Sequence, residues 1–125
     1  MKKILLAEDD KGLSRSIDIL LTLDGYEVIS VYNGEEALNN LCYQRYDLLI
    51  TDIIMPCLNG IELIQKIRKL HPQIPILVVS GNLSEGIIKE LQYQNIKKIL
   101  PKPIDPIDLR KMVGDIFNNG SNNKQ

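Results

Sequence analysis

The chain of 125 residues is predicted to fold as one α/β domain in which a parallel sheet lies between two layers of helices. Two observations predict this class. Five short apolar runs are continuous rather than alternating, which is typical of strands covered on both faces. A segment with helical spacing of its apolar residues follows each run, and strict alternation of this kind requires parallel strands joined by right-handed crossovers. The expected architecture is a three-layer, doubly wound sandwich.

The first half of the chain contains two strands and two helices before the central strand. Residues 3–7 are a buried strand that ends at Glu8, and a helix from about Leu13 ends at Gly25, which suits a left-handed cap. Residues 26–31 are the second strand. Asn33 then caps a helix whose apolar face carries Ala37, Leu38, Leu41 and Cys42.

The second half contains three more strands. The central strand, residues 47–51, ends at Asp52, because Pro56 does not allow it to continue. Helices are expected over residues 60–70 and 84–94, the second of which ends at Asn95 as a left-handed stop. Strands are expected over 76–79 and 97–100, and a last helix begins at Asp105-Pro106. Residues 118–125 are polar and rich in Asn, so we expect a domain over 1–117 followed by a disordered tail or a truncated linker.

The composition excludes several classes of function. With 15 basic and 16 acidic residues the formal net charge is −1, so direct binding of nucleic acid by this chain is not expected. No apolar run approaches the roughly 20 residues of a membrane-spanning helix, and Met1 leads into a strand without a secretory cleavage pattern. We therefore expect a cytoplasmic protein without membrane contact. Cys42 and Cys57 lack the spacing of metal ligands and are interpreted as reduced thiols.

Polar residues follow four of the five strands directly. The carboxyl ends of parallel strands lie at one edge of the sheet, so these residues are expected to meet although they are far apart in sequence. They are Glu8 and Asp9 after the first strand, Asp52 after the third, Ser80 after the fourth and Lys102 after the fifth. The sequence therefore predicts a functional site at this edge.

Three carboxylates at close range repel one another and require a cation. Mg²⁺ (or Mn²⁺) suits oxygen ligands, with Asp9 and Asp52 binding directly, Glu8 through a water, and a backbone carbonyl after Asp52 completing the set. Lys102 supplies a second, fixed positive charge. This combination favours phosphoryl transfer onto the carboxylate of Asp52, after which the hydroxyl of Ser80 would bind the new phosphoryl group and move its loop.

Four motifs together resemble the receiver (REC) domain of two-component response regulators, which are CheY-like proteins. The motifs are Ile4–Asp10, Thr51-Asp52 with Met55-Pro56 and Asn59-Gly60, Val78–Gly81, and Pro101-Lys102-Pro103. The resemblance covers residues 2–117. It implies a flavodoxin-like fold with strand order 2-1-3-4-5 and a cis Lys102-Pro103 peptide.

The resemblance also implies functional roles. Asp52 would be phosphorylated by the phosphohistidine of a sensor histidine kinase or a phosphotransfer protein, with Mg²⁺ at Glu8, Asp9, Asp52 and the Ile54 carbonyl. Ser80 and Lys102 would contact the phosphoryl group. The surface of the fourth helix, fifth strand and fifth helix would signal to a downstream partner or output domain, from a monomer or a phosphorylation-dependent dimer. The chain would not be an enzyme beyond Mg²⁺-dependent self-phosphorylation and slow autodephosphorylation.

Three positions distinguish this chain within that pattern. Ile99 stands where the family usually has Tyr or Phe, three residues before the lysine, so the aromatic switch is absent. Either coupling to the output surface is weakened, or backbone shifts carry it. Ile54 and Asn82 flank the expected phosphoryl position and are candidates for tuning its lifetime.

Other functions fit the motifs less well. A flavin protein would need a phosphate-binding loop after the first strand, where Glu8, Asp9 and Asp10 would repel phosphate, and an aspartate phosphatase would need an acid at the position of Ile54. A degenerate receiver that acts as a phosphorylation-independent protein-interaction module is disfavoured, because all five site residues are present.

Overall fold

The computed structural model describes residues 1–57 and 59–122, and its five strands pair in parallel in the order β2-β1-β3-β4-β5. The elements in chain order are β1 (Lys3–Ala7), α1 (Lys11–Leu23), β2 (Glu27–Val31), α2 (Gly34–Tyr43), β3 (Leu48–Thr51), α3 (Gly60–Leu70), β4 (Ile76–Ser80), α4 (Glu85–Tyr93), β5 (Lys98–Pro101) and α5 (Pro106–Asn122). The predicted fold class and strand order are confirmed.

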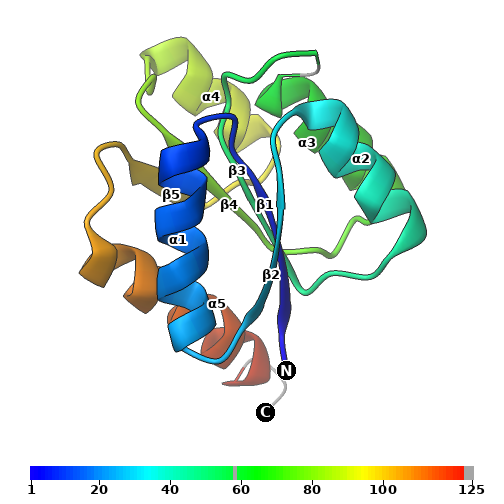
Figure 1. The fold of residues 1–125 in the computed structure, drawn as a ribbon. Coiled ribbons are helices and arrows are strands. Elements are labelled where there is room, and N and C mark those ends of the chain that lie inside the picture. The colour runs from blue at the N-terminus through cyan, green and yellow to red at the C-terminus, as the bar shows by residue number, and fades with distance from the viewer. Residues whose placement is uncertain (58, 123–125) are drawn as a thin grey trace.

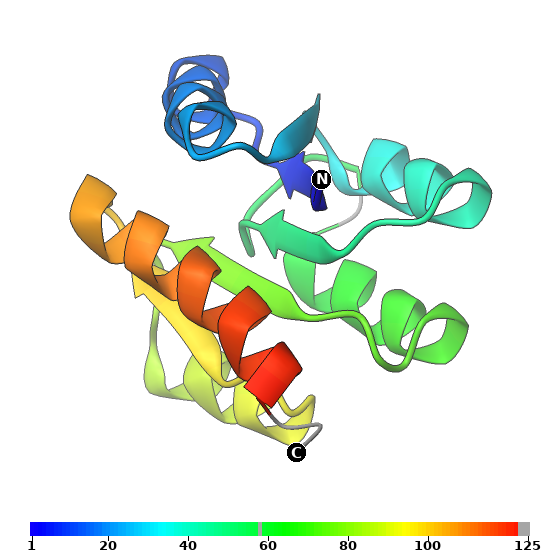
Figure 2. The same cartoon turned by 90° about the horizontal axis from the view of Figure 1, so that it is seen from below.

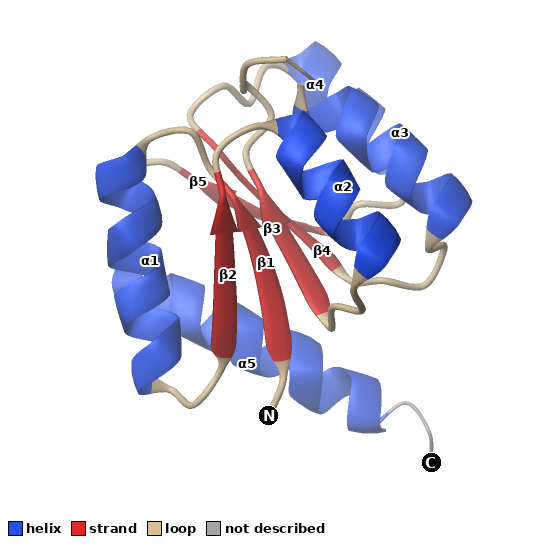
Figure 3. Cartoon of the chain, turned by 45° about the vertical axis from the view of Figure 1, so that its right-hand side comes forward, coloured by secondary structure: helices blue, strands red, loops and turns tan. Residues whose placement is uncertain are grey.

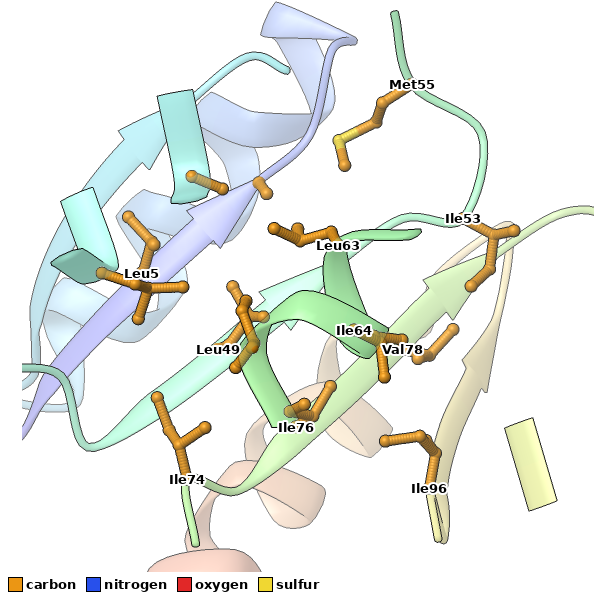
Figure 4. Close-up of a cluster of buried hydrophobic side chains, with 14 of the residues drawn as sticks. Leu5, Leu49, Ile53, Met55, Leu63, Ile64, Ile74, Ile76, Val78 and Ile96 are labelled. Carbon is orange, nitrogen blue, oxygen red and sulfur yellow. The ribbon is translucent and has the colours of Figure 1, made fainter. Parts of the chain in front are cut away.

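The sheet is covered on both faces (Figures 1 and 2). Helices α1 and α5 pack on one face, and α2, α3 and α4 pack on the other, as the side view in Figure 3 also shows. Two apolar clusters fill the space between the layers, and Figure 4 shows the cluster on the side of α2, α3 and α4. Every residue of β3 and β4 is buried, which explains why their sequences are unbroken apolar runs.

Side chains cap the helices near the carboxyl edge of the sheet. Asp10, Asn33, Asn59 and Ser84 each accept a hydrogen bond from a backbone N–H in the first turn of the following helix. Helix α1 begins at Lys11, earlier than the predicted Leu13, because the carboxylate of Asp10 accepts the Leu13 N–H at 3.1 Å. The chain leaves helices at Gly25 (φ 93°) and Asn95 (φ 62°), both predicted as left-handed stops.

Two expectations need correction. Cys42 is exposed rather than part of the apolar face of α2, because it lies roughly 100° around the helix from the buried Leu41. Helix α5 continues to Asn122, whereas disorder was expected from Asn118. Extending a helix that already packs through Leu109 and Val113 requires no new nucleation, so even weak helix formers can follow. Residues 123–125 of the expected tail lie outside the described residues.

The strand register determines where the polar residues lie. Ala7 pairs with Thr51, so Glu8 and Asp52 are the next residues on neighbouring strands, and the Asp52 N–H donates to the Ala7 carbonyl at 3.1 Å. Ser80 pairs with Pro101 in the same way at the other side of the sheet. The loops after all five strands therefore gather at one end of the molecule, opposite the N-terminus (Figure 1). None of the helices in the described part of the chain has the length and apolarity that crossing a bilayer requires.

The loop between β3 and α3 contains a backbone strain. Cys57 has φ 70°, in the left-handed region that disfavours any side chain with a Cβ, and its side chain is exposed. Cys57 therefore has no packing role that offsets this conformation.

We predict that Cys57→Gly raises the free energy of unfolding by about 0.5–1 kcal/mol, since relief of the strain exceeds the entropy that Gly adds to the unfolded chain. Cys57→Val should lower it by about 1–2 kcal/mol, because a β-branched residue fits this region least. Urea unfolding followed by circular dichroism measures both changes. Equal stability of the two variants would contradict the assignment of strain.

Candidate metal and phosphoryl site

Three acidic side chains meet at the carboxyl edge of the sheet. One carboxylate oxygen from each of Glu8, Asp9 and Asp52 lies within 4.8 Å of the others. Glu8 and Asp52 are buried, with 2% and 6% of their surface exposed, whereas Asp9 is open to solvent. An all-oxygen set of this kind, open on one side, suits a hard divalent ion that keeps several of its waters. The structure thus brings together the three acids predicted from the ends of β1 and β3.

Lys102 places an ammonium group between two of these acids. Its Nζ lies 2.7 Å from Glu8 Oε1 and 2.6 Å from Asp52 Oδ2. The lysine follows β5, and its backbone N–H donates to the Ser80 carbonyl at 3.0 Å, which ties the fifth strand's loop to the end of β4. The peptide between Lys102 and Pro103 is cis, as expected.

The charges in the site alter the proton affinities of its members. Burial raises the pKa of the Glu8 carboxyl, and the Asp52 carboxylate adds to this, while hydrogen bonds from Lys102 and the Asp10 N–H act against it. Burial alone would lower the pKa of Lys102, but its hydrogen bonds to Asp52 and Glu8 outweigh burial and raise it. A raised pKa of Glu8 means that its ionisation reduces stability as the pH rises through that pKa. A further cation would relieve this cost.

The carboxylate of Asp52 is held in one orientation. Its Oδ1 accepts the backbone N–H groups of Ile53 at 2.6 Å and Ile54 at 3.3 Å, and its Oδ2 accepts the Lys102 ammonium. The hydroxyl of Thr51 donates to the backbone carbonyl of Asp52 at 2.9 Å. The hydrogen bonds therefore fix the direction in which the Asp52 carboxylate points.

The remaining predicted positions surround this centre. Ser80 is buried at the end of β4, and its hydroxyl accepts the N–H of the exposed Asn82 at 3.1 Å. Ile54 is 58% exposed, on the loop after Asp52. Ile99 lies on β5, where it is half-buried and packs against the apolar cluster on the side of α2, α3 and α4; Leu83 and Ile87 pack against the same cluster.

Sequence reasoning missed two contributions to the site. Besides capping α1, Asp10 donates its backbone N–H to Glu8 Oε2 at 3.0 Å and so orients that carboxylate. Gly60 was quoted only as part of a motif, yet it lies directly against the backbone of Asp52. Only the close approach of α3 to the end of β3 reveals this contact.

Comparisons with known proteins agree with the geometry. The response regulator receiver domain family matches residues 4–114. The response regulator receiver protein CpdR of Brucella abortus (strain 2308) is 34% identical over 116 residues, which cover 93% of this chain and 94% of CpdR. The transcriptional regulatory protein GlrR of Escherichia coli (strain K12) is 30% identical over 112 residues, which cover 90% of this chain but 25% of GlrR.

Solved structures show the same fold. A receiver domain protein (CheY-like) from Methanospirillum hungatei JF-1 superposes with a TM-score of 0.94 at 26% identity, covering 98% of both chains. The chemotaxis response regulator CheY4 of Vibrio cholerae superposes with a TM-score of 0.86 at 28% identity, covering 93% of this chain and 98% of CheY4. With its parallel sheet, its acidic edge and these relatives, this chain belongs to the family of receiver domains of two-component response regulators.

Proposed function

We propose that this receiver domain accepts a phosphoryl group on Asp52 from the phosphohistidine of a sensor histidine kinase or a phosphotransfer protein. One observation carries the proposal: the buried carboxylate of Asp52 lies beside two further acids, Glu8 and Asp9, and its Oδ2 is 2.6 Å from the Lys102 ammonium. Asp52 accepts one more hydrogen bond than Glu8: two backbone N–H groups and Lys102 hold its oxygens, whereas one backbone N–H and Lys102 hold those of Glu8. A position within a kinase-driven relay also implies a cytoplasmic location.

The donors in the site fit Mg²⁺ or Mn²⁺. Glu8, Asp9, Asp52 and the backbone carbonyl of Ile54 would hold the ion, and their oxygen chemistry supports this choice. When bound, the ion neutralises charge on the phosphoryl oxygens. Lys102 would contribute the second positive charge to the same group.

The transfer proceeds from the side chain of Asp52. A carboxylate oxygen attacks phosphorus, the bond from phosphorus to the histidine nitrogen breaks, and the electron pair leaves with that nitrogen. The product is an acyl phosphate on Asp52. Beyond this step and self-phosphorylation from small phosphodonors, the chain only loses the phosphoryl group slowly to water, and Ile54 and Asn82 would set that rate by excluding or orienting the water.

Signalling would follow from the new group. The Ser80 hydroxyl, which now accepts the Asn82 N–H, would instead donate to a phosphoryl oxygen and draw the loop after β4 inward. The surface of α4, β5 and α5 would pass this change to a downstream partner or output domain, in a monomer or a phosphorylation-dependent dimer. The match covers 94% of CpdR but 25% of GlrR, so the relatives include a protein little longer than the matched domain and a protein with much further sequence beyond it.

Incubation with Mg²⁺ and acetyl phosphate is expected to add one phosphoryl group, because the site needs no kinase to position Asp52. Intact-mass spectrometry should show this adduct, its loss in base, and no adduct without metal or in Asp52→Asn. A normal signalling output from the Asp52→Asn variant would favour instead the phosphorylation-independent interaction module.

Lys102→Met is expected to lower the free energy of unfolding by about 3 kcal/mol in EDTA, because it leaves two buried carboxylates without their cation. Mg²⁺ should restore more stability to this variant than to the wild type. Lys97→Met is the matched control, since Lys97 is exposed, and should change stability by less than about 0.5 kcal/mol. Urea titrations measure all three proteins; equal stability of the two variants in EDTA would argue against the counter-ion role.

The isoleucine at position 99 is expected to weaken coupling between the site and α4. Backbone amide chemical shifts of residues 85–93, recorded with and without a phosphoryl mimic, should then change little, and Ile99→Tyr should enlarge the changes. Large shifts in the wild type would show that the apolar cluster against which Ile99, Leu83 and Ile87 pack transmits the switch without an aromatic ring.

A further inference from the structure

The first residue of α3 lies against the backbone of the proposed phosphoacceptor. A Cβ built on Gly60 would lie 2.2 Å from the backbone oxygen of Asp52, 2.6 Å from Ile53 Cα and 3.0 Å from the carbonyl carbon of Asp52. All three atoms belong to the main chain, so no flexible side chain can move aside. The Gly60 N–H also donates to the Ile53 carbonyl at 2.7 Å.

The peptide unit that Gly60 contacts also orients the reactive carboxylate. It joins the carbonyl of Asp52, which accepts the Thr51 hydroxyl, to the N–H of Ile53, which donates to Asp52 Oδ1 at 2.6 Å. A displacement of this peptide would therefore rotate the donor that holds the carboxylate. The side chain of Asp52 would turn with it, away from Lys102.

Neither partner of this contact can retreat easily. The Asp52 N–H is bound to the Ala7 carbonyl of β1, which holds the end of β3 in the sheet. On the other side, α3 is anchored by the buried side chains Leu63, Ile64 and Ile67. An added methyl group must displace the peptide after Asp52 or lift the start of the helix.

We propose that Gly60 is a positioning residue for phosphoryl transfer: the absence of its side chain lets α3 clamp the 52–53 peptide and so aim the Asp52 carboxylate. This inference rests on the proposed function of Asp52. It assigns to Gly60 an effect on the rate of transfer in addition to any effect on stability.

The chain offers matched controls for this substitution. A Cβ at Gly86 in α4 or at Gly114 in α5 meets nothing within 4 Å, so Ala fits both positions and improves helix propensity. Asn59→Ala removes the side chain that caps α3. That side chain accepts the Glu62 N–H, and no hydrogen bond joins it to Asp52. This variant destabilises the same helix end without adding an atom beside Asp52.

The experiment compares the wild type with the Gly60→Ala, Gly86→Ala and Asn59→Ala variants. Intact-mass spectrometry measures the rate at which acetyl phosphate phosphorylates Asp52 at saturating Mg²⁺, and each rate is divided by the fraction of folded protein. Mg²⁺ affinity is measured in parallel by titration calorimetry, and the folded fraction by circular dichroism. We expect Gly60→Ala to lose at least tenfold in rate and to bind Mg²⁺ more weakly. The other two variants should stay within about twofold of the wild-type rate.

The outcomes separate this inference from the proposed function. Wild-type protein that takes up no phosphoryl group would overturn the function itself. Wild-type activity in folded Gly60→Ala would leave the function intact and overturn the positioning role. If Gly60→Ala alone is too unstable to fold, it is combined with Gly86→Ala and Gly114→Ala, which add helix stability. If this triple variant also fails to fold, Gly60 is needed for folding, and the positioning role is rejected.

Discussion

The arrangement of the site depends on one ammonium group, that of Lys102, which forms short ion pairs with both Glu8 and Asp52. Two of the molecule's carboxylates are buried side by side, and such groups are costly to ionise unless a cation lies between them. Lys102 meets this need from a third strand. Lys102 balances only part of the negative charge, because Asp9 is also present, and the three acids could hold a further cation. The electrostatic imbalance is therefore the source of the proposed activity.

The parallel topology explains how Glu8, near the start of the sequence, and Lys102, near its end, come into contact. Every strand runs in the same direction, so every strand end delivers its next residue to the same edge, and β1, β3 and β4 are neighbours at the centre of the sheet. The helices that follow begin at this edge too, capped by Asp10 and Asn59. At Gly60, the first residue of α3, the backbone of the helix lies against the backbone of Asp52, directly after β3. The loops that carry the site residues are thus the same loops that connect the strands to their helices.

A continuous apolar path leads from this edge toward α4. Ile53 and Met55, on the loop after Asp52, belong to the cluster in Figure 4, and Leu83, on the loop after Ser80, packs against the same cluster. Ile87 and Ile99 adjoin it as well. A change in either loop must repack these side chains, since well-packed interiors deform little. If signalling does not depend on an aromatic residue at position 99, this cluster is the route by which a change in either loop would reach α4.

The sequence by itself determined the fold class, the strand order implied by the family motifs and the five polar residues at the strand ends, because apolar periodicity and strand-end position are local properties that each segment carries alone. It also placed the stops at Gly25 and Asn95, where backbone conformation depends on residue type. It could not place the boundary of α1, the exposure of Cys42 or the length of α5, which depend on capping and on packing against other elements. Only the tertiary structure decided that Lys102 bridges Glu8 and Asp52, that the Asp10 N–H orients Glu8, and that Gly60 abuts the Asp52 carbonyl. Lys102 is distant in sequence from both acids, and the contacts of Asp10 and Gly60, although closer in sequence, depend on turns that form only once the sheet and its helices have packed.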